Sequence, residues 1–227
     1  MAEPFAYDRT GYEIVEEEPP ELLGRNLRSG AYLLAGATAF FFLCFLFAFF
    51  YLRSLDNAGM WKPKGVDASV AWGTVNVALY VLSALLVRVG LGELAAGRRS
   101  TWRLAGGAAL VSGIAGLVVQ AVGWGQQSFG PADGGFASVY FGWTAFLFLF
   151  VLATLYWLET VLATSIRYRH SSDGTPAPGE ASGDPHRTAP DIQNPLSLVR
   201  PQLEALSFYW TFLAGIAVLA WVLLYLL

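Results

Sequence analysis

The chain has 227 residues, of which 55% are hydrophobic and only 14% are charged, and its formal net charge is −3. Soluble globular domains carry about 25% charged residues, and a chain of this size cannot build a core large enough to bury so much apolar surface. The composition therefore excludes an ordinary water-soluble domain, and the negative net charge gives no support for nucleic-acid binding.

The chain begins with a polar segment, residues 1–29, in which the acidic run Glu16, Glu17 and Glu18 precedes two prolines. We expect this segment to be a cytoplasmic N-terminal tail. Its carboxylates form either a solvated surface or a docking contact, and the first interpretation is favoured.

Four long apolar stretches follow, at about residues 30–52, 69–91, 104–124 and 136–166. Each has the roughly 20 mostly apolar residues that a membrane-spanning helix needs. None shows the alternation of apolar and polar residues that is typical of strands in a membrane β-barrel. Because backbone groups in lipid must be hydrogen-bonded within the protein, we predict that these stretches are helices.

Charged residues are nearly absent from these stretches, and the exceptions are Arg88 and Glu159. Both lie toward the ends of their spans that the distribution of Lys and Arg, described below, places on the cytoplasmic side. One interpretation is that Arg88 extends to the lipid headgroups and Glu159 reaches water, as long charged side chains do near the ends of spans. The alternative is that they pair with each other or with a lipid headgroup.

Small and neutral polar residues predict close packing between the helices. The third stretch carries small residues that would let a neighbouring backbone approach: Gly106, Gly107, Ser112, Gly113, Gly116 and Gly123. Hydrogen bonds between helices are expected from Thr38, Thr74, Asn76, Ser83, Ser112, Gln120, Thr144, Thr154 and Thr211. The single cysteine, Cys44, cannot form an intrachain disulfide and is expected to fill the core.

Residues 167–203 are rich in Pro, Gly and Ser, which predicts a flexible cytoplasmic loop. His170 and His186 lie in this loop. We expect both to be solvated, because a metal site needs three or four converging ligands. A fifth apolar span, residues 204–227, follows the loop.

The distribution of Lys and Arg gives the spans a direction. Of the 14 such residues, 11 lie in the N-terminal tail, around residues 88–103 and in residues 167–203, whereas three lie in residues 53–64. Because cytoplasmic loops carry the excess of Lys and Arg, we predict a cytoplasmic N-terminus and an external C-terminus. The predicted fold class is therefore all-α, an integral membrane bundle of five transmembrane helices.

The predicted spans contain no histidine and no aspartate, so they offer no imidazole to a haem or a copper ion. We predict no catalytic, cofactor-binding or metal-binding residues on this chain. A bundle with many packing residues and no reactive groups is typical of a subunit of a larger complex.

The fifth span follows the frame of a motif known from one protein family, E-x-x-x-W-Y-W-H-F-V-D, and departs from it at several positions. The residues that follow its frame are Glu204, Phe208, Tyr209 and Trp210. Thr211 stands where the motif has histidine, and Ala214 stands where it has aspartate.

Three other spans carry related motifs in the same order as the family. In the fourth, the frame of S-x-F-F-x-x-T-G-x-H-x-x-H-V is kept, but Leu147 and Phe150 replace its two histidines. In the first, Thr38 replaces a glutamate ahead of three phenylalanines, and in the third, Gly123 replaces the glutamate of Q-x-x-E-W. On these motifs the chain resembles subunit III of the haem–copper oxidases, in a divergent form of its five-helix bacterial type.

The resemblance implies an accessory, non-catalytic subunit III of a respiratory cytochrome c oxidase in the bacterial plasma membrane. Such a complex reduces O₂ to water and pumps protons. The chain would pack against subunits I and II, which carry the haem and copper, and would hold phospholipid. Candidates for lipid or partner contact are Arg88, Glu159, Tyr209 and Trp210.

Two alternatives stay open at this point. One is a subunit III-like component of a nitric oxide reductase or a quinol oxidase. The other is a stand-alone small transporter, although such proteins usually show charges within the membrane, broken helices or inverted repeats, and five spans do not divide into equal halves.

Overall fold

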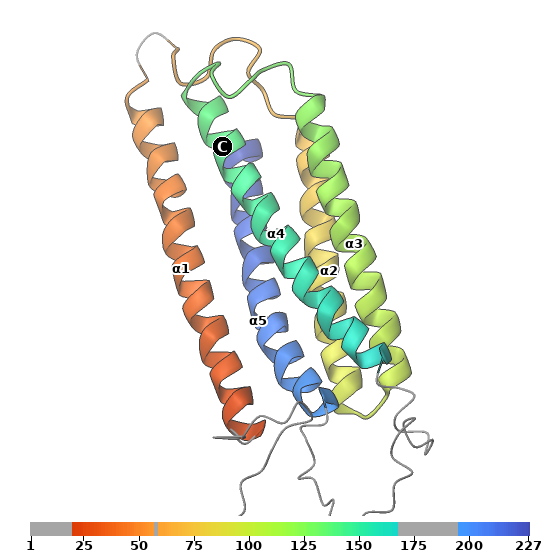
Figure 1. Cartoon of the computed structure of the whole chain (residues 1–227). Helices are drawn as coiled ribbons and strands as arrows, with labels where there is room; N and C mark the ends of the chain where they lie inside the picture. The colour runs from red at the N-terminus through yellow and green to blue at the C-terminus, as the bar shows by residue number, and fades with distance from the viewer. Residues whose placement is uncertain (1–19, 57–58, 168–194) are drawn as a thin grey trace, which may run out of the picture.

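The computed structural model describes residues 20–56, 59–167 and 195–227. Over these residues the chain forms five long α-helices (Figure 1): α1 (Pro20–Ser54), α2 (Val70–Ala95), α3 (Arg99–Gly125), α4 (Gly135–Arg167) and α5 (Pro195–Trp221). A short π-helix, η2 (Val222–Leu226), continues α5. All five long helices are long and apolar enough to cross a membrane. The predicted fold class is confirmed: the chain is an all-α, multi-pass membrane protein.

The helices extend beyond the apolar stretches that predicted them. The first helix begins at Pro20 rather than near residue 30, and the fifth begins at Pro195 rather than near residue 204. Proline is favoured at the first position of a helix, because its fixed φ suits the helix and its missing N–H would have no partner there. Hydropathy marks only the part of a helix that lies in lipid, so it does not reveal such polar first turns.

Parts of the predicted organisation lie outside the described residues. These are most of the N-terminal tail, residues 1–19, and most of the predicted loop, residues 168–194, with both histidines. Residues 20–29 and 195–203 are helical and belong to α1 and α5, not to a tail and a loop. The sidedness of the membrane stays a prediction.

Helix α5 occupies the middle of the bundle (Figure 1) and packs against α1, α2 and α4. Helices α2 and α3 form a close hairpin, and α4 packs against both α3 and α1. The α2–α3 turn is short, residues 96–98. Gly97 adopts a φ of +78°, and the Arg98 N–H donates to the Glu93 carbonyl at 2.9 Å, a helix ending that favours glycine.

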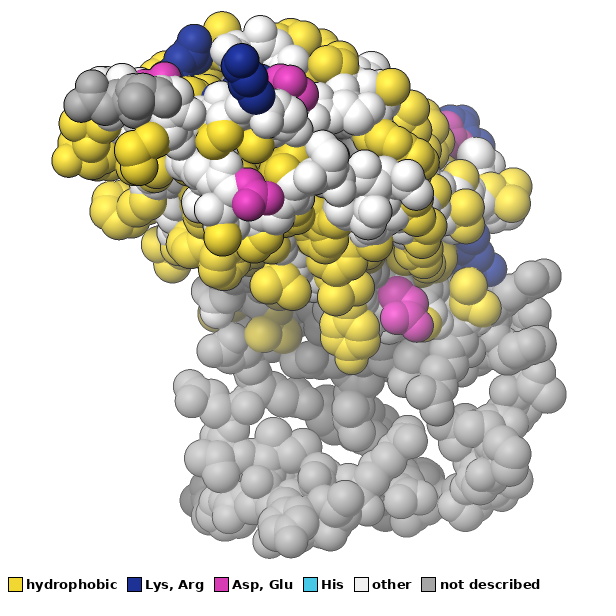
Figure 2. All heavy atoms as spheres, turned by 90° about the horizontal axis from the view of Figure 1, so that it is seen from above, with side chains coloured by type: hydrophobic (Ala, Val, Ile, Leu, Met, Phe, Trp, Pro, Cys, Tyr) yellow, Lys and Arg dark blue, Asp and Glu magenta, His cyan; other side chains and the backbone are white. Residues whose placement is uncertain are grey.

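Large side chains cover the outside of the bundle as well as its centre. The largest fully buried side chains include Trp102, Trp143, Tyr140 and Phe42. Figure 2 looks onto the end that carries the 55–69 and 126–134 loops, where a few charged side chains are scattered among uncharged groups and hydrophobic side chains cover the flanks. Cys44 lies on such a flank: its side chain is exposed, so the expectation that it fills the core is wrong.

Two glycines of α3 leave room for large side chains of neighbouring helices. A Cβ atom on Gly116 would lie 2.5 Å from the Tyr80 ring of α2, and one on Gly113 would overlap Leu155 of α4. A Cβ on Gly107, in contrast, would meet nothing within 4 Å. Gly113 and Gly116 therefore leave room for a branched side chain and a ring, while the Ser112 hydroxyl reaches the Leu79 carbonyl of α2 at 3.0 Å, as the predicted close approach of a backbone requires.

This difference between the glycines yields a prediction for the Gly116→Ala variant. We expect it to lower the free energy of unfolding by about 1–3 kcal/mol, the usual cost of overpacking a filled core. Gly107→Ala is the matched control and should be neutral or stabilising by up to about 1 kcal/mol, because alanine is the better helix former. Thermal unfolding of both variants in detergent checks this, and equal behaviour of the two would contradict it.

Candidate functional site: the polar contacts that hold α5

Tyr209 and Trp210 connect α5 to helices on its two sides. Successive residues of a helix point about 100° apart, so the two side chains face different neighbours. The hydroxyls of Tyr209 and Thr38 on α1 are hydrogen-bonded at 3.0 Å. The Trp210 indole N–H donates to Ser83 Oγ on α2, also at 3.0 Å.

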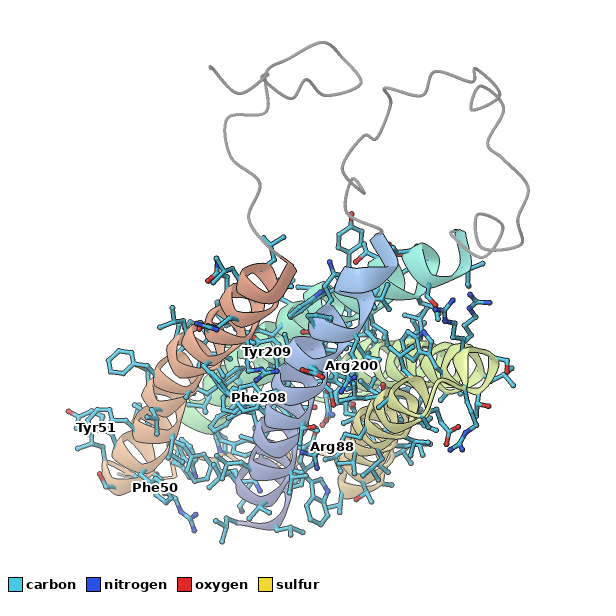
Figure 3. All side chains as sticks on the ribbon, turned by 90° about the horizontal axis from the view of Figure 1, so that it is seen from below. Phe50, Tyr51, Arg88, Arg200, Phe208 and Tyr209 are labelled. Carbon is cyan, nitrogen blue, oxygen red and sulfur yellow. The ribbon has the colours of Figure 1, made fainter. Side chains whose placement is uncertain are left out.

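Ser83 passes this connection on to α3. Its hydroxyl accepts from Trp210 and donates to the Ala109 carbonyl at 2.7 Å. One chain of neutral hydrogen bonds and packed rings therefore joins α1, α5, α2 and α3. Figure 3 shows α5, which carries Tyr209, lying between α1 on one side and the α2–α3 hairpin on the other.

Both aromatic residues lie inside the chain's own bundle. Tyr209 and Trp210 are each only 2% exposed. The structure therefore places them as internal contacts and not on a surface that lipid or a partner reaches. Their neighbour Phe208 is exposed and packs edge-on against Tyr32 of α1, with ring centroids 4.6 Å apart.

A second set of polar contacts lies in the half of the bundle near the 55–69 and 126–134 loops. Asn76 of α2 donates its amide N–H to Gln120 of α3. Trp124 of α3 donates to Thr144 of α4 at 3.0 Å, and Trp221 of α5 donates to Thr74 of α2 at 3.0 Å.

The same cluster reaches η2. The Tyr225 hydroxyl donates to the Tyr140 hydroxyl of α4 at 3.2 Å, and Gln127 donates to Tyr140 at 3.2 Å. All these groups are neutral, as suits hydrogen bonds between helices in lipid.

These contacts test the prediction that neutral polar residues bond between helices. It is confirmed for Thr38, Thr74, Asn76, Ser83, Ser112, Gln120 and Thr144. It is wrong for Thr154 and Thr211, whose hydroxyls donate to carbonyls of their own helices at 2.7 Å. Threonine in a helix can always reach the carbonyl four residues earlier, so the sequence pattern alone does not separate the two cases.

Sequence reasoning missed one buried connection between α3 and α4. The Trp102 indole donates to Ser165 Oγ at 3.0 Å, and the Arg103 guanidinium donates to the Ser165 carbonyl. From the sequence, Arg103 contributes only to the predicted orientation in the membrane, and Ser165 is one of several polar residues near the end of an apolar stretch.

The charged candidates lie on the surface. Arg88 and Glu159 are both exposed, and within the described part of the chain neither makes an ion pair, so they do not pair with each other. Glu204 instead accepts from Arg28 of α1 at 2.7 Å and from Arg200 at 3.1 Å. Figure 3 shows Arg88 on α2 and Arg200 on α5. Such exposed pairs contribute about 0–1 kcal/mol each.

The positions where this chain departs from the family motifs are filled by packing groups. Leu147 is buried, and Phe150 packs against Phe41 and Phe42 with ring centroids 5.9 and 5.8 Å apart. Gly123 is buried, and a Cβ there would meet Trp72 only at an ordinary 3.9 Å. Ala214 is half-buried. Among the described residues no three His, Cys, Asp or Glu side chains come together as a metal site would require.

The comparison with protein families agrees with the motifs. The family model for cytochrome c oxidase subunit III matches residues 20–175, which include all of α1 to α4. The chain belongs to the cytochrome c oxidase subunit III family. Helix α5, with its Glu204, Tyr209 and Trp210 motif, lies outside the matched residues, so the assignment of that motif stays a prediction.

A curated relative supports the subunit III assignment. Cytochrome c oxidase subunit 3 of Formosania lacustris is 27% identical to this chain over 154 residues. The match covers 66% of the chain and 59% of that protein, so this subunit III homologue corresponds to less than two thirds of the relative.

Proposed function

We propose that this chain is the accessory subunit III of a respiratory cytochrome c oxidase in a bacterial plasma membrane. The observation that carries the proposal is the family match over α1 to α4. In this role the chain packs against subunits I and II, which hold the haem and copper that reduce O₂. It contributes to the durability of the complex rather than to the chemistry.

The use of polar groups within the bundle supports a structural role. The buried hydroxyl, amide and indole groups named above are mostly occupied by bonds between helices. Glu204, the acid of the α5 motif, is paired with two arginines. The flanks carry large exposed apolar residues, among them Leu33, Phe40, Phe47, Leu104 and Val111, which suit contact with lipid or with apolar helices of other subunits.

The test is to isolate the chain from its native membrane through an affinity tag and to identify what accompanies it. We expect a haem-bearing subunit I and a copper-bearing subunit II, seen by mass spectrometry and by a haem absorption spectrum. A subunit I without such a subunit II would favour a nitric oxide reductase or a quinol oxidase. Recovery without any haem-bearing subunit would refute the proposal.

We further propose that Arg88 attracts an anionic phospholipid at the membrane interface. Its exposed guanidinium has no partner within the described part of the chain, and one such charge is worth about 1 kcal/mol near an anionic bilayer surface. Arg88→Ala should therefore reduce the retention of anionic phospholipid by about fivefold, measured by lipid analysis of the purified protein. Arg88→Lys keeps the positive charge and is the control: it should retain the phospholipid, and an equal loss in both variants would contradict the proposal.

A further inference from the structure

A small cavity with several polar groups in its lining lies between α2, α3, α4 and the end of α5. Its volume is about 20 Å³, and its polar lining comes from Asn76, Tyr80, Gln120, Thr144 and Tyr225. All five side chains are uncharged. It lies within the second set of polar contacts described above, in the half of the bundle near the 55–69 and 126–134 loops.

Two buried polar atoms at this cavity are unpaired. Asn76 Oδ1 and the Tyr80 hydroxyl, on neighbouring side chains one helical turn apart, make no well-formed hydrogen bond among the described residues, although the two side chains are only 6% and 3% exposed. The amide N–H of Asn76 already donates to Gln120, so only its carbonyl oxygen is free. Trp143 Nε1 is also buried and unpaired, but it does not line the cavity. Unpaired polar groups are costly in apolar surroundings, and water cannot reach them from the bilayer core.

We propose that this cavity binds a single water molecule, which hydrogen-bonds to Asn76 Oδ1 and to the Tyr80 hydroxyl. A carbonyl oxygen needs a donor, while a hydroxyl can both donate and accept, and water supplies both functions. The volume of about 20 Å³ exceeds the roughly 10–15 Å³ that one buried water requires. An ion is disfavoured, because no carboxylate or cationic side chain of the lining would balance its charge.

Two glycines and the π-helical turn after α5 shape this site. Gly116 of α3 makes room for the Tyr80 ring, and Gly73 of α2 makes room for the Tyr225 ring, which would lie 2.6 Å from a Cβ there. The π-helical turn Val222–Leu226 carries Tyr225. Such turns redirect side chains and occur frequently at functional sites. The proposed water thus completes the connection of α2 and α3 to the end of α5, whether or not the oxidase assignment holds.

The sign of one stability change tests the proposal. If the site were dry, Tyr80→Phe would remove an unpaired buried hydroxyl, and the Tm would rise or stay unchanged. With the water bound, the same variant loses a hydrogen bond, and the Tm should fall by about 2–4 °C for a chain of this size. Tyr51→Phe makes the same chemical change at an exposed position and should leave the Tm unchanged. A Tm of Tyr80→Phe at or above that of the unaltered protein overturns the proposal.

A second test of the proposal is to observe the water molecule directly. A high-resolution cryo-electron microscopy map of the full chain, with the subunits that accompany it, should show a peak about 2.7–3.2 Å from both Asn76 Oδ1 and the Tyr80 hydroxyl. Well-resolved side chains with no peak between them would refute the water site even if the Tm falls. A peak coordinated at the shorter distances of a metal ion would refute it as well.

Discussion

Truncating Trp210 to alanine is expected to lower the free energy of unfolding by about 3–5 kcal/mol, as large aromatic truncations do in packed cores. The side chain is buried in the middle of the bundle, and its indole N–H is bonded to Ser83 at 3.0 Å. The substitution removes both the ring packing and the connection from α5 to the α2–α3 hairpin. Thermal or denaturant unfolding of the purified protein in detergent measures the loss.

Two further variants separate the parts of this effect. Trp210→Phe keeps an aromatic ring but removes the N–H donor, so it should recover most of the loss and leave a deficit of about 1 kcal/mol for the hydrogen bond. Phe208→Ala truncates a neighbouring aromatic residue that is 38% exposed and should cost clearly less than Trp210→Ala. If Phe208→Ala and Trp210→Ala were equally destabilising, Trp210 would not be the anchor of α5.

The number and class of the elements could be predicted because lipid imposes a simple length rule. A stretch of about 20 apolar residues is best explained as a membrane-spanning helix, so hydropathy places all five helices near their observed positions. The polar turns at Pro20 and Pro195 could not be found in this way, because they lie outside the apolar stretches. Cys44 shows a related limit: in a membrane protein both the core and the surface are apolar, so hydropathy does not tell them apart.

The polar contacts were predictable as a class but not as pairs. Asn76 and Gln120 stand out because amides are expensive in hydrocarbon, yet their pairing depends on the register of α2 against α3. Ser165 shows the opposite case, because a serine near the end of a span is unremarkable until Trp102 is seen to donate to it. The resemblance pointed to Tyr209 and Trp210, but only the packing of α5 at the centre of the bundle shows which helices they join.

Neutral residues stand at several positions where the family motifs have acidic or histidine side chains. Thr38 stands where the family motif has glutamate; it is 2% exposed, and its hydroxyl bonds to the neutral hydroxyl of Tyr209. The positions that carry histidine in α4 of the family hold Leu147 and Phe150 here, which pack as apolar groups. A carboxylate restored at residue 38 would therefore enter a bundle whose neighbouring groups have become neutral.

Thr38→Glu is accordingly expected to destabilise the protein by about 3–5 kcal/mol, the usual cost of an uncompensated buried charge. Thr38→Gln is the matched control, because the glutamine side chain has nearly the same size as that of glutamate and adds no charge. The glutamine should cost clearly less, since its penalty comes from overpacking and from the altered bond to Tyr209. Unfolding of both variants at neutral pH in detergent measures the difference. If Thr38→Glu were no more destabilising than Thr38→Gln, the bundle would contain a group that compensates the buried carboxylate. The expectation that the groups around residue 38 are all neutral would then be wrong.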